Sequence, residues 1–277
     1  MATNSILDNL DEFSTIPTLT LHLGADILKQ ATFVLVEGPG DIDLFRPLVT
    51  PKATLIRSYG AKGAIERIIT NYFVSDPRVI AIRDKDYQIA PISTKIFHCD
   101  HCCAEMMMVT RDIPMIAIHS NYYKGTTPFR LLRNQTLKAL FDLSILRKCN
   151  DIHRWNVNFS GINIDSAYDP NLATFFNNLV TQIDTMNPTN QIDSAKMVLW
   201  SIEKHNHAFS SLSDIVNGHD FIALFVHECK RSGASKKISH DSVSRSLRSS
   251  FSPPVFKKTK LWMALHLYGG KNHLKIV

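Results

Sequence analysis

The sequence lacks any apolar run close to the roughly 20 residues that a transmembrane helix needs. Residues 1–13 carry Asp8, Asp11 and Glu12, whereas a secretory signal would begin with a basic segment followed by an apolar one. The chain has only five cysteines, an odd number that argues against a disulfide framework and fits a reducing compartment. We therefore expect a cytoplasmic protein that does not associate with membranes.

Motifs of several common enzyme classes are also missing. The sequence contains no Gly-x-Ser-x-Gly elbow, no Walker lysine loop and no Gly-x-Gly-x-x-Gly fingerprint. Serine hydrolases, P-loop ATPases and dinucleotide-dependent enzymes are therefore poorly supported, because each class uses its motif to build a nucleophile or a phosphate site.

The chain does have enough apolar content for a core, together with an excess of positive charge. Its 277 residues are 44% hydrophobic, which suits one large domain or two ordinary ones. The 31 Lys and Arg exceed the 25 Asp and Glu and give a net charge of +6. This balance favours a polyanionic partner such as nucleic acid.

Strand and helix patterns alternate from residue 32 to residue 84. Short apolar runs at Phe33–Val36, Ala53–Ile56 and Val79–Ile82 predict three strands. The glycine turns at residues 38–40 and 60–63 each open a segment with helical spacing. Strand, helix, strand, helix, strand is typical of a parallel sheet with right-handed crossovers, so we predict an α/β fold.

The rest of the chain is predicted to be mainly helical. Helices are expected at residues 128–148, 171–186, 194–206, 219–231, 242–250 and 255–268. Short strands are expected at residues 94–97 and 106–109, a strand or hairpin at 155–164, and an exposed loop at 232–237. Since the alternation ends near residue 125, we predict an α/β domain over residues 1–125 and a helical, basic region over residues 126–277.

Acidic residues follow two of the predicted strands. Glu37 comes directly after the first strand, and Asp84 and Asp86 come just after the third. In open α/β sheets the ligand crevice lies outside the carboxyl ends of the strands, so these three carboxylates should converge. Carboxylates set that close repel one another and raise each other's pKa, so the cluster persists most readily around a hard divalent cation. The sequence thus predicts a Mg²⁺ site that acts on phosphodiesters.

These acidic segments resemble the pattern of the Toprim family, which includes topoisomerases, bacterial primases and the nucleases of the overcoming-lysogenization-defect group. In Val36-Glu37-Gly38-Pro39-Gly40-Asp41 a glutamate ends one strand, and in Asp84-Lys85-Asp86 an Asp-x-Asp ends a later one. With the turn Gly60-Ala61-Lys62-Gly63, the segments look most like Toprim-like domains encoded beside ABC-type ATPases, such as the effector nuclease of PARIS-type phage-defence systems. The resemblance covers residues 32–87, and the tail also looks similar at residues 217–220 and 256–261.

The resemblance implies a Mg²⁺-dependent nuclease in which Glu37, Asp84 and Asp86 are catalytic and bind the metal, which Mn²⁺ could replace. Asp41 would be a further metal ligand. The implied substrate is nucleic acid, either RNA such as tRNA or DNA. The implied biological role is that of a toxic effector in antiphage defence, controlled by an ABC-type ATPase partner. A homodimer is a possible assembly of the chain.

Basic side chains could hold the phosphate backbone of such a substrate. The candidates are Lys62 in the second glycine turn and Lys257 and Lys258 near the carboxyl terminus. The alternative for each is an exposed lysine on a solvated surface.

Other interpretations of the acids stay open. Asp41 and Asp84 could be satisfied by nearby backbone amides. The chain would then be a non-catalytic module that binds nucleic acid or an ATPase and keeps the acids only as structural caps. Primase-like nucleotidyl transfer would require a nucleoside triphosphate site that the sequence does not offer. One departure from the family concerns its later acidic residues: Asp112 is kept but Pro114 stands where a glutamate is expected, so Glu105 could substitute.

A segment rich in cysteine and histidine, residues 98–103, competes as a metal site. Cys99 and Cys102 have the two-residue gap of zinc knuckles, and Cys149 with His153 would be the partner pair. The long separation of the pairs and the lack of a second Cys-x-x-Cys favour half-buried thiols over structural Zn²⁺.

His219 begins a predicted helix and is a candidate acid/base group, because imidazole titrates near neutral pH. In the alternative, which the pattern favours, Asp220 caps the helix and His219 forms a hydrogen bond within the fold. The contacts of His219 and Asp220 in the folded chain distinguish these two interpretations.

Overall fold

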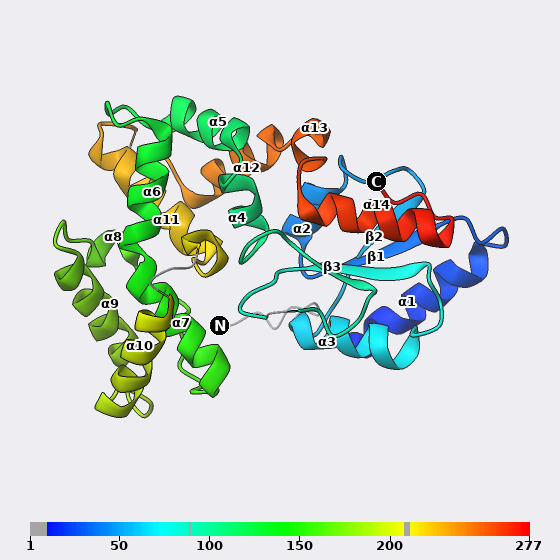
Figure 1. The fold of residues 1–277 in the computed structure, drawn as a ribbon, viewed down its shortest axis with the longest axis horizontal. Coiled ribbons are helices and arrows are strands. Elements are labelled where there is room, and N and C mark those ends of the chain that lie inside the picture. The colour runs from blue at the N-terminus through cyan, green and yellow to red at the C-terminus, as the bar shows by residue number, and fades with distance from the viewer. Residues whose placement is uncertain (1–9, 89, 208–210, 236) are drawn as a thin grey trace, which may run out of the picture. The chain divides into compact units, whose positions relative to one another are not determined.

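One parallel sheet of four strands organises the first part of the chain (Figure 1). The computed structural model describes residues 10–88, 90–207, 211–235 and 237–277, and of residues 61 and 62 it describes the backbone. The strands are β1 (Thr32–Val36), β2 (Ala53–Arg57), β3 (Val79–Arg83) and β4 (Ile96–His98), in the spatial order β2-β1-β3-β4. This sheet, followed by a mainly helical remainder, confirms the predicted α/β class.

The strand register brings the carboxyl ends of the strands to one edge of the sheet. Val36 of β1 pairs with Arg57 of β2, and Arg83 of β3 pairs with His98 of β4. Every residue of β1 and β3 is buried, as expected for central parallel strands that are covered on both faces. Polar residues that follow β1 and β3 therefore lie at the same edge.

Helices cover the sheet through apolar side chains. α2 (Pro39–Phe45) connects β1 to β2, and α3 (Ala61–Arg67) continues into a π-helical turn at Ile68–Tyr72. The buried isoleucines of α3 and this turn join one core cluster with Leu19 of α1 (Glu12–Ala25) and with residues of β1, β3 and β4. α1 was not predicted, because Pro17 lies inside it and its threonines lower helix propensity.

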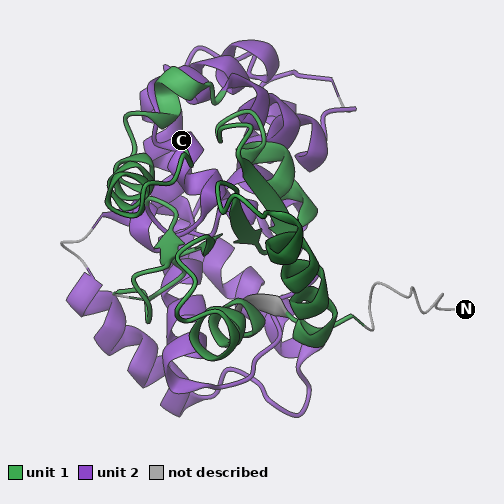
Figure 2. Ribbon diagram, turned by 90° about the vertical axis from the view of Figure 1, so that its right-hand side faces the viewer, with its two compact units in different colours: residues 1–100, 251–277 green, residues 101–250 purple. Residues whose placement is uncertain are grey.

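The chain forms two compact units, coloured separately in Figure 2. Unit 1 comprises residues 1–100 and 251–277, and unit 2 comprises residues 101–250. This division differs from the predicted boundary after residue 125, because the carboxyl-terminal segment returns to the sheet. Its helices are α13 (Pro253–Phe256) and α14 (Lys260–Asn272).

Asp100 anchors this returning segment. Its carboxylate accepts hydrogen bonds from the backbone N–H groups of Lys260 and Leu261 at 3.0 and 2.9 Å, so it caps α14. The N–H of Thr50 also donates to the carbonyl oxygen of Ile276 at 2.9 Å. Helical periodicity does not indicate where such a helix docks.

In the described residues of unit 2, the regular secondary structure consists of helices joined by irregular segments. The helices are α4 (Ala104–Val109), α5 (Asp112–Tyr122), α6 (Phe129–Ala139), α7 (Phe141–His153), α8 (Ile164–Ala167), α9 (Leu172–Met186), α10 (Ser194–His207), α11 (Gly218–Arg231) and α12 (His240–Ser250), with a 3-10 turn at Leu212–Asp214. The predicted helices at 171–186, 194–206, 219–231 and 242–250 are confirmed, whereas the one predicted over 128–148 is divided between α6 and α7. The predicted strand at 106–109 is wrong, because a short apolar run does not distinguish a buried helix from a buried strand.

The strand or hairpin predicted at 155–164 is also wrong. Side-chain amides hold this segment instead of a neighbouring strand. Asn150 exchanges two hydrogen bonds with the backbone of Val157, at 2.9 and 3.2 Å, and Asn187 exchanges two with that of Asn158, both at 2.8 Å. These amides satisfy the backbone groups that a sheet would otherwise pair.

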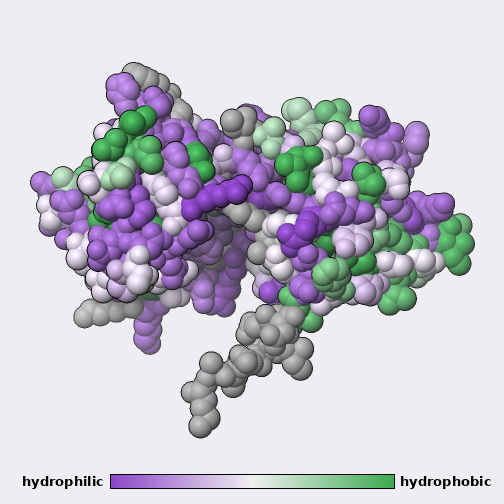
Figure 3. All heavy atoms as spheres, turned by 90° about the horizontal axis from the view of Figure 1, so that it is seen from below, coloured by the Kyte–Doolittle hydropathy of each residue, from purple (hydrophilic) through white to green (hydrophobic). Residues whose placement is uncertain are grey.

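On the face drawn in Figure 3, most of the surface is hydrophilic and hydrophobic side chains gather in separate small groups. Exposed large apolar residues occur in both units, for example Ile27 and Leu28 after α1 and Val198 and Ile202 in α10. Among the described residues, no helix combines the length and the apolar character needed to cross a bilayer.

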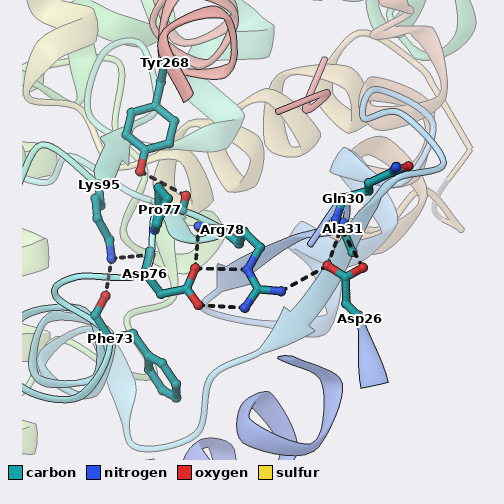
Figure 4. Close-up of polar contacts among 9 residues, drawn as sticks. All are labelled: Asp26, Gln30, Ala31, Phe73, Asp76, Pro77, Arg78, Lys95 and Tyr268. Carbon is teal, nitrogen blue, oxygen red and sulfur yellow. Dashed lines mark hydrogen bonds and ion pairs between the residues drawn. The ribbon is translucent and has the colours of Figure 1, made fainter. Parts of the chain in front are cut away.

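A hydrogen-bonded ion network fixes the amino end of β3 (Figure 4). Arg78 donates to both carboxylate oxygens of Asp76, at 3.1 and 2.8 Å, and to Asp26 at 3.1 Å. The Lys95 ammonium donates to the carbonyl oxygens of Phe73 and Asp76. Burial opposes ionisation of Asp76, but the hydrogen bonds and positive charge of Arg78 outweigh it and lower the pKa of that carboxyl. The network ties β3 to the turn that precedes it.

Candidate functional site

Glu37 follows β1, and Asp84 and Asp86 follow β3, its neighbour in the sheet. All three residues therefore lie at the carboxyl edge, where α/β proteins bind ligands. Each is partly buried. The structure thus places the predicted catalytic acids at the edge that the sequence indicated.

A buried arginine that the sequence analysis missed lies among these acids. Arg83 is the last residue of β3, and its side chain is fully buried. Its Nε lies 3.6 Å from a carboxylate oxygen of Glu37, and its Nη2 lies 3.6 Å from one of Asp86. Its Nη1 donates to Glu66 of α3 in the closest of these contacts. Glu37 and Asp86 therefore share one guanidinium group, and Glu66 is a further acid of the site.

The contacts of Arg83 with Glu37 and Asp86 are ion pairs that are too long to be hydrogen bonds. Nε donates to the carbonyl oxygen of Asp84 at 3.2 Å. Nη2 is buried and makes no hydrogen bond to any residue that the structure describes. A buried guanidinium nitrogen without a hydrogen bond is uncommon and marks this group as incompletely satisfied.

The turn after β3 is held in an uncommon backbone conformation. Asp86 has φ of 48°, in the left-handed region, which aspartate tolerates better than most residues do. The N–H of Gln88 donates to the Lys85 carbonyl oxygen at 3.0 Å, and its side-chain amide donates to Glu66 at 3.3 Å. These bonds fix the turn that carries Asp84 and Asp86.

The residues of this edge fit Mg²⁺ in their chemistry, because carboxylate oxygens are its preferred protein ligands. Their positions fit it only in part. Within the described chain, Glu37, Asp84 and Asp86 do not bring three ligand atoms within 4.8 Å of one another. The arrangement is held around Arg83, so a shared ion would require the carboxylates to move toward one another.

Asp41, the predicted further metal ligand, has a structural role in α2. Its carboxylate accepts a hydrogen bond from the N–H of Gly38 at 2.9 Å, across the first turn of the helix. This contact matches the alternative of an acid satisfied by a backbone amide and fixes the turn that follows Glu37.

His98 is a second residue of this edge that the sequence analysis did not assign to it. It ends β4 and pairs in register with Arg83. Its Nε2 is buried and makes no hydrogen bond within the described residues. Burial lowers the pKa of His98, and the positive charges of Arg83 and Lys85 lower it further, against the opposing effect of Asp86. The imidazole is therefore neutral near pH 7.

The predicted substrate lysines differ in what can be said of them. Lys62 lies in the first turn of α3, and its side chain is outside the described residues. Lys257 and Lys258 are exposed in the turn between α13 and α14. Because Asp100 follows β4 and caps α14, this turn is anchored near the carboxyl edge of the sheet.

The cysteines are buried and free of disulfides. In the part of the chain that the structure describes, Cys99, Cys102 and Cys149 belong to no group of three or more metal-ligand atoms within 4.8 Å. Burial raises the pKa of Cys149 to about 11, and the negative charge of Glu203 contributes a smaller increase. Such a thiol stays protonated and unreactive at neutral pH.

Glu105 and Asp112, the two acids compared above with the later acidic residues of the Toprim pattern, belong to unit 2. Glu105 lies on α4 rather than on a strand. Asp112 begins α5 and forms ion pairs with Arg130 and Arg133, at 2.5 and 3.6 Å. The hydrogen bond from Arg130 lowers the pKa of Asp112. Asp112 thus has a local structural role.

Comparisons with known proteins do not identify a family. No protein-family model matches this chain, and no curated protein matches it. The similarity to the Toprim family therefore stays a prediction from the motifs around Glu37 and Asp84.

Proposed function

We propose that unit 1 is a Mg²⁺-dependent nuclease domain that hydrolyses phosphodiester bonds of nucleic acid. One observation carries this proposal. Two acids from the ends of separate strands, Glu37 and Asp86, lie around the incompletely hydrogen-bonded guanidinium of Arg83, at the edge where α/β proteins bind ligands. Sites that are kept incompletely satisfied are often functional.

In this proposal Glu37, Asp84 and Asp86 hold the ion, which when bound neutralises a phosphate oxygen and stabilises the leaving group. Arg83 keeps Glu37 and Asp86 at the edge before the substrate arrives. A carboxylate oxygen of this set that does not contact the ion would orient the attacking water and accept its proton. Lys257 and Lys258 hold the phosphate backbone as exposed positive charges.

The motif resemblance supports a more specific biological role. We infer a toxic effector of antiphage defence that cleaves RNA such as tRNA, or DNA, and is restrained by an ABC-type ATPase. The excess of 31 Lys and Arg over 25 Asp and Glu is consistent with a polyanionic substrate.

A second function is favoured by the same arginine. Because Arg83 already supplies a positive charge to Glu37, Glu66 and Asp86, the acids have a counter-ion without metal. The domain would then be a non-catalytic adaptor that binds nucleic acid or the ATPase.

The test compares the parent protein with Glu37→Gln, each incubated with mixed cellular RNA and with plasmid DNA in Mg²⁺, Mn²⁺ or EDTA. Asp43→Asn is the matched control, since Asp43 is an exposed acid on the same helix as Asp41. We expect cleavage in metal that is lost in EDTA and in Glu37→Gln but kept in Asp43→Asn. Equal cleavage by Glu37→Gln and the parent would refute the catalytic assignment, and no cleavage by the parent would favour the adaptor.

A further inference from the structure

Unit 2 contains a cavity of about 730 Å³ that the proposed nuclease site does not use. Side chains of α7, α11 and α12 line it, together with the irregular segment 157–162. Its volume lies in the range of pockets that bind small ligands.

Hydrogen bonds within the chain fix the irregular wall of this cavity. Asn150 and Asn187 each exchange two hydrogen bonds with its backbone, at Val157 and at Asn158. Gly161 completes the wall with φ of 88°, a left-handed conformation that favours glycine. A wall fixed in this way reduces the entropy lost on binding, as ligand sites require.

Arg147 presents one unused edge of its guanidinium in this cavity. Its Nε and Nη2 donate to the two carboxylate oxygens of Asp220 at 2.8 and 3.0 Å, and Asp220 is only 6% exposed. The guanidinium carbon lies 4.9 Å from the centre of the Phe159 ring. Its Nη1 makes no hydrogen bond to any described residue of the chain. Arg147 is therefore fixed in place with two N–H groups left for an anionic acceptor.

Two histidines supply a flat surface at the same cavity. The rings of His219 and His240 lie 5.2 Å apart and 18° from parallel, with Nδ1 of His219 3.4 Å from Nε2 of His240. Burial lowers the pKa of His240 and so does His219, whereas Glu105 and Asp241 act in the opposite sense. His219 is exposed, so one face of this stacked pair is open to a ligand. The expectation that Asp220 caps α11 is wrong, because Asn217 accepts the bonds from His219 and Asp220.

We propose that this cavity binds an unpaired nucleotide, with its base stacked on His219 and its phosphate on Nη1 of Arg147. Imidazole and guanidinium planes are common partners of splayed-out bases and of phosphates. The apolar side chains of Val157, Ile162 and Ile164 would contact the sugar and base edge. The inference rests on the proposed function, for which it adds a substrate-holding site in unit 2.

The test uses the full chain carrying Glu37→Gln in EDTA, so that binding is measured without cleavage. Calorimetric titration with AMP and with a short single-stranded oligoribonucleotide should give saturable binding. His219→Ala should weaken binding about tenfold, as loss of one stacking contact does. His205→Ala is the matched control, because His205 is an exposed histidine of α10 that does not line the cavity.

A second variant tests the phosphate contact. Arg147→Met combined with Asp220→Leu replaces the buried ion pair with apolar residues of similar size, which proteins often tolerate. This pair should lower the affinity for AMP to that for adenosine, whereas the parent should prefer AMP at least about fivefold. Thermal melting of each variant checks that it folds.

Binding of AMP identifies a free nucleotide as a sufficient ligand, and binding of the oligoribonucleotide alone identifies a nucleotide within a strand. Each result supports the pocket. The proposal fails if neither ligand binds, if His219→Ala and His205→Ala bind equally well, or if the only saturable ligand is added Zn²⁺. Because binding is read in a protein without Glu37, a failed nuclease assay leaves this result unaffected.

Discussion

The two ends of β3 carry the same chemistry in two different states. At its amino end, Arg78 donates hydrogen bonds of 2.8 to 3.1 Å to Asp76 and Asp26. At its carboxyl end, Arg83 lies 3.6 Å from Glu37 and from Asp86, and its Nη2 makes no hydrogen bond within the described chain. The hydrogen bonds of the Arg78 guanidinium to its acids are complete, whereas those of the Arg83 guanidinium are not.

This difference separates stability from function. A satisfied ion network in a partly buried place holds the fold and needs no further ligand. An incompletely satisfied one costs stability, and proteins often keep such groups where a ligand or a reaction uses them. We therefore expect substitution of the acids at the amino end to alter folding and substitution of the acids at the carboxyl end to alter activity.

The largest expected effect is on cleavage. Asp84→Asn should lower nuclease activity by about 10²–10⁴-fold, because it removes a charged ligand or acid/base group, while changing the melting temperature little. Asp76→Asn should do the reverse. The measurement is initial cleavage rate beside thermal melting for both variants. Equal loss of activity in the two would contradict the division between the ends of β3.

The next effect is on stability and its dependence on metal. Arg83→Met should destabilise the fold by about 3 kcal/mol, because it leaves carboxylates near a buried position without a counter-ion. If Mg²⁺ can take the place of the guanidinium, added Mg²⁺ should raise the melting temperature of Arg83→Met more than that of the parent.

Arg78→Met is the matched variant at the other end of the strand. It removes an arginine whose side chain is 11% exposed, against 0% for Arg83, and leaves Asp76 and Asp26 where no metal site is proposed. Its melting temperature should not respond to Mg²⁺ beyond the response of the parent. A similar Mg²⁺ response in Arg78→Met and Arg83→Met would show that the ion acts on the protein surface in general.

A smaller effect concerns acid stability. Hydrogen bonds from Arg78 lower the pKa of Asp76 against the effect of its burial. As pH falls, the Asp76 carboxylate is therefore protonated in the unfolded chain before it is protonated in the folded chain. The stabilisation is full above the unfolded pKa near 4 and is lost as pH falls through the folded value. Asp76→Asn should remove about 1 kcal/mol of it, seen as a flatter acid limb in urea unfolding from pH 6 to about pH 3, with Asp43→Asn as the control.

The placement of Glu37, Asp84 and Asp86 could be predicted because it depends on local signals. Apolar runs mark the strands β1 and β3, and central parallel strands end at one edge of their sheet. Arg83 and Glu66 could not be predicted in the same way. Arg83 looks like the polar boundary of an apolar run, and its burial depends on Glu66, which only the packing of α3 on the sheet brings near.

The errors in the fold have a similar cause. Residues 155–159 alternate like those of a strand, but the backbone at Val157 and Asn158 is held by Asn150 of α7 and by Asn187, which follows α9. The docking of α14 depends on Asp100, more than 150 residues earlier in the chain. Contacts of this kind leave no periodic signal in either partner.

The smallest expected effect comes from Tyr268, which links α14 to the amino end of β3. Its hydroxyl donates to the carbonyl oxygen of Pro77 at 3.0 Å, and burial raises its pKa to about 12, helped by the charge of Asp76. Tyr268→Phe keeps the ring on Phe97 and removes one hydrogen bond, so it should cost about 1 kcal/mol. Tyr72→Phe, at a residue 49% exposed, should cost less than half of that. Urea unfolding measures both, and cleavage should be unchanged in each, because α14 would then support the network at Arg78 without reaching the acids around Arg83.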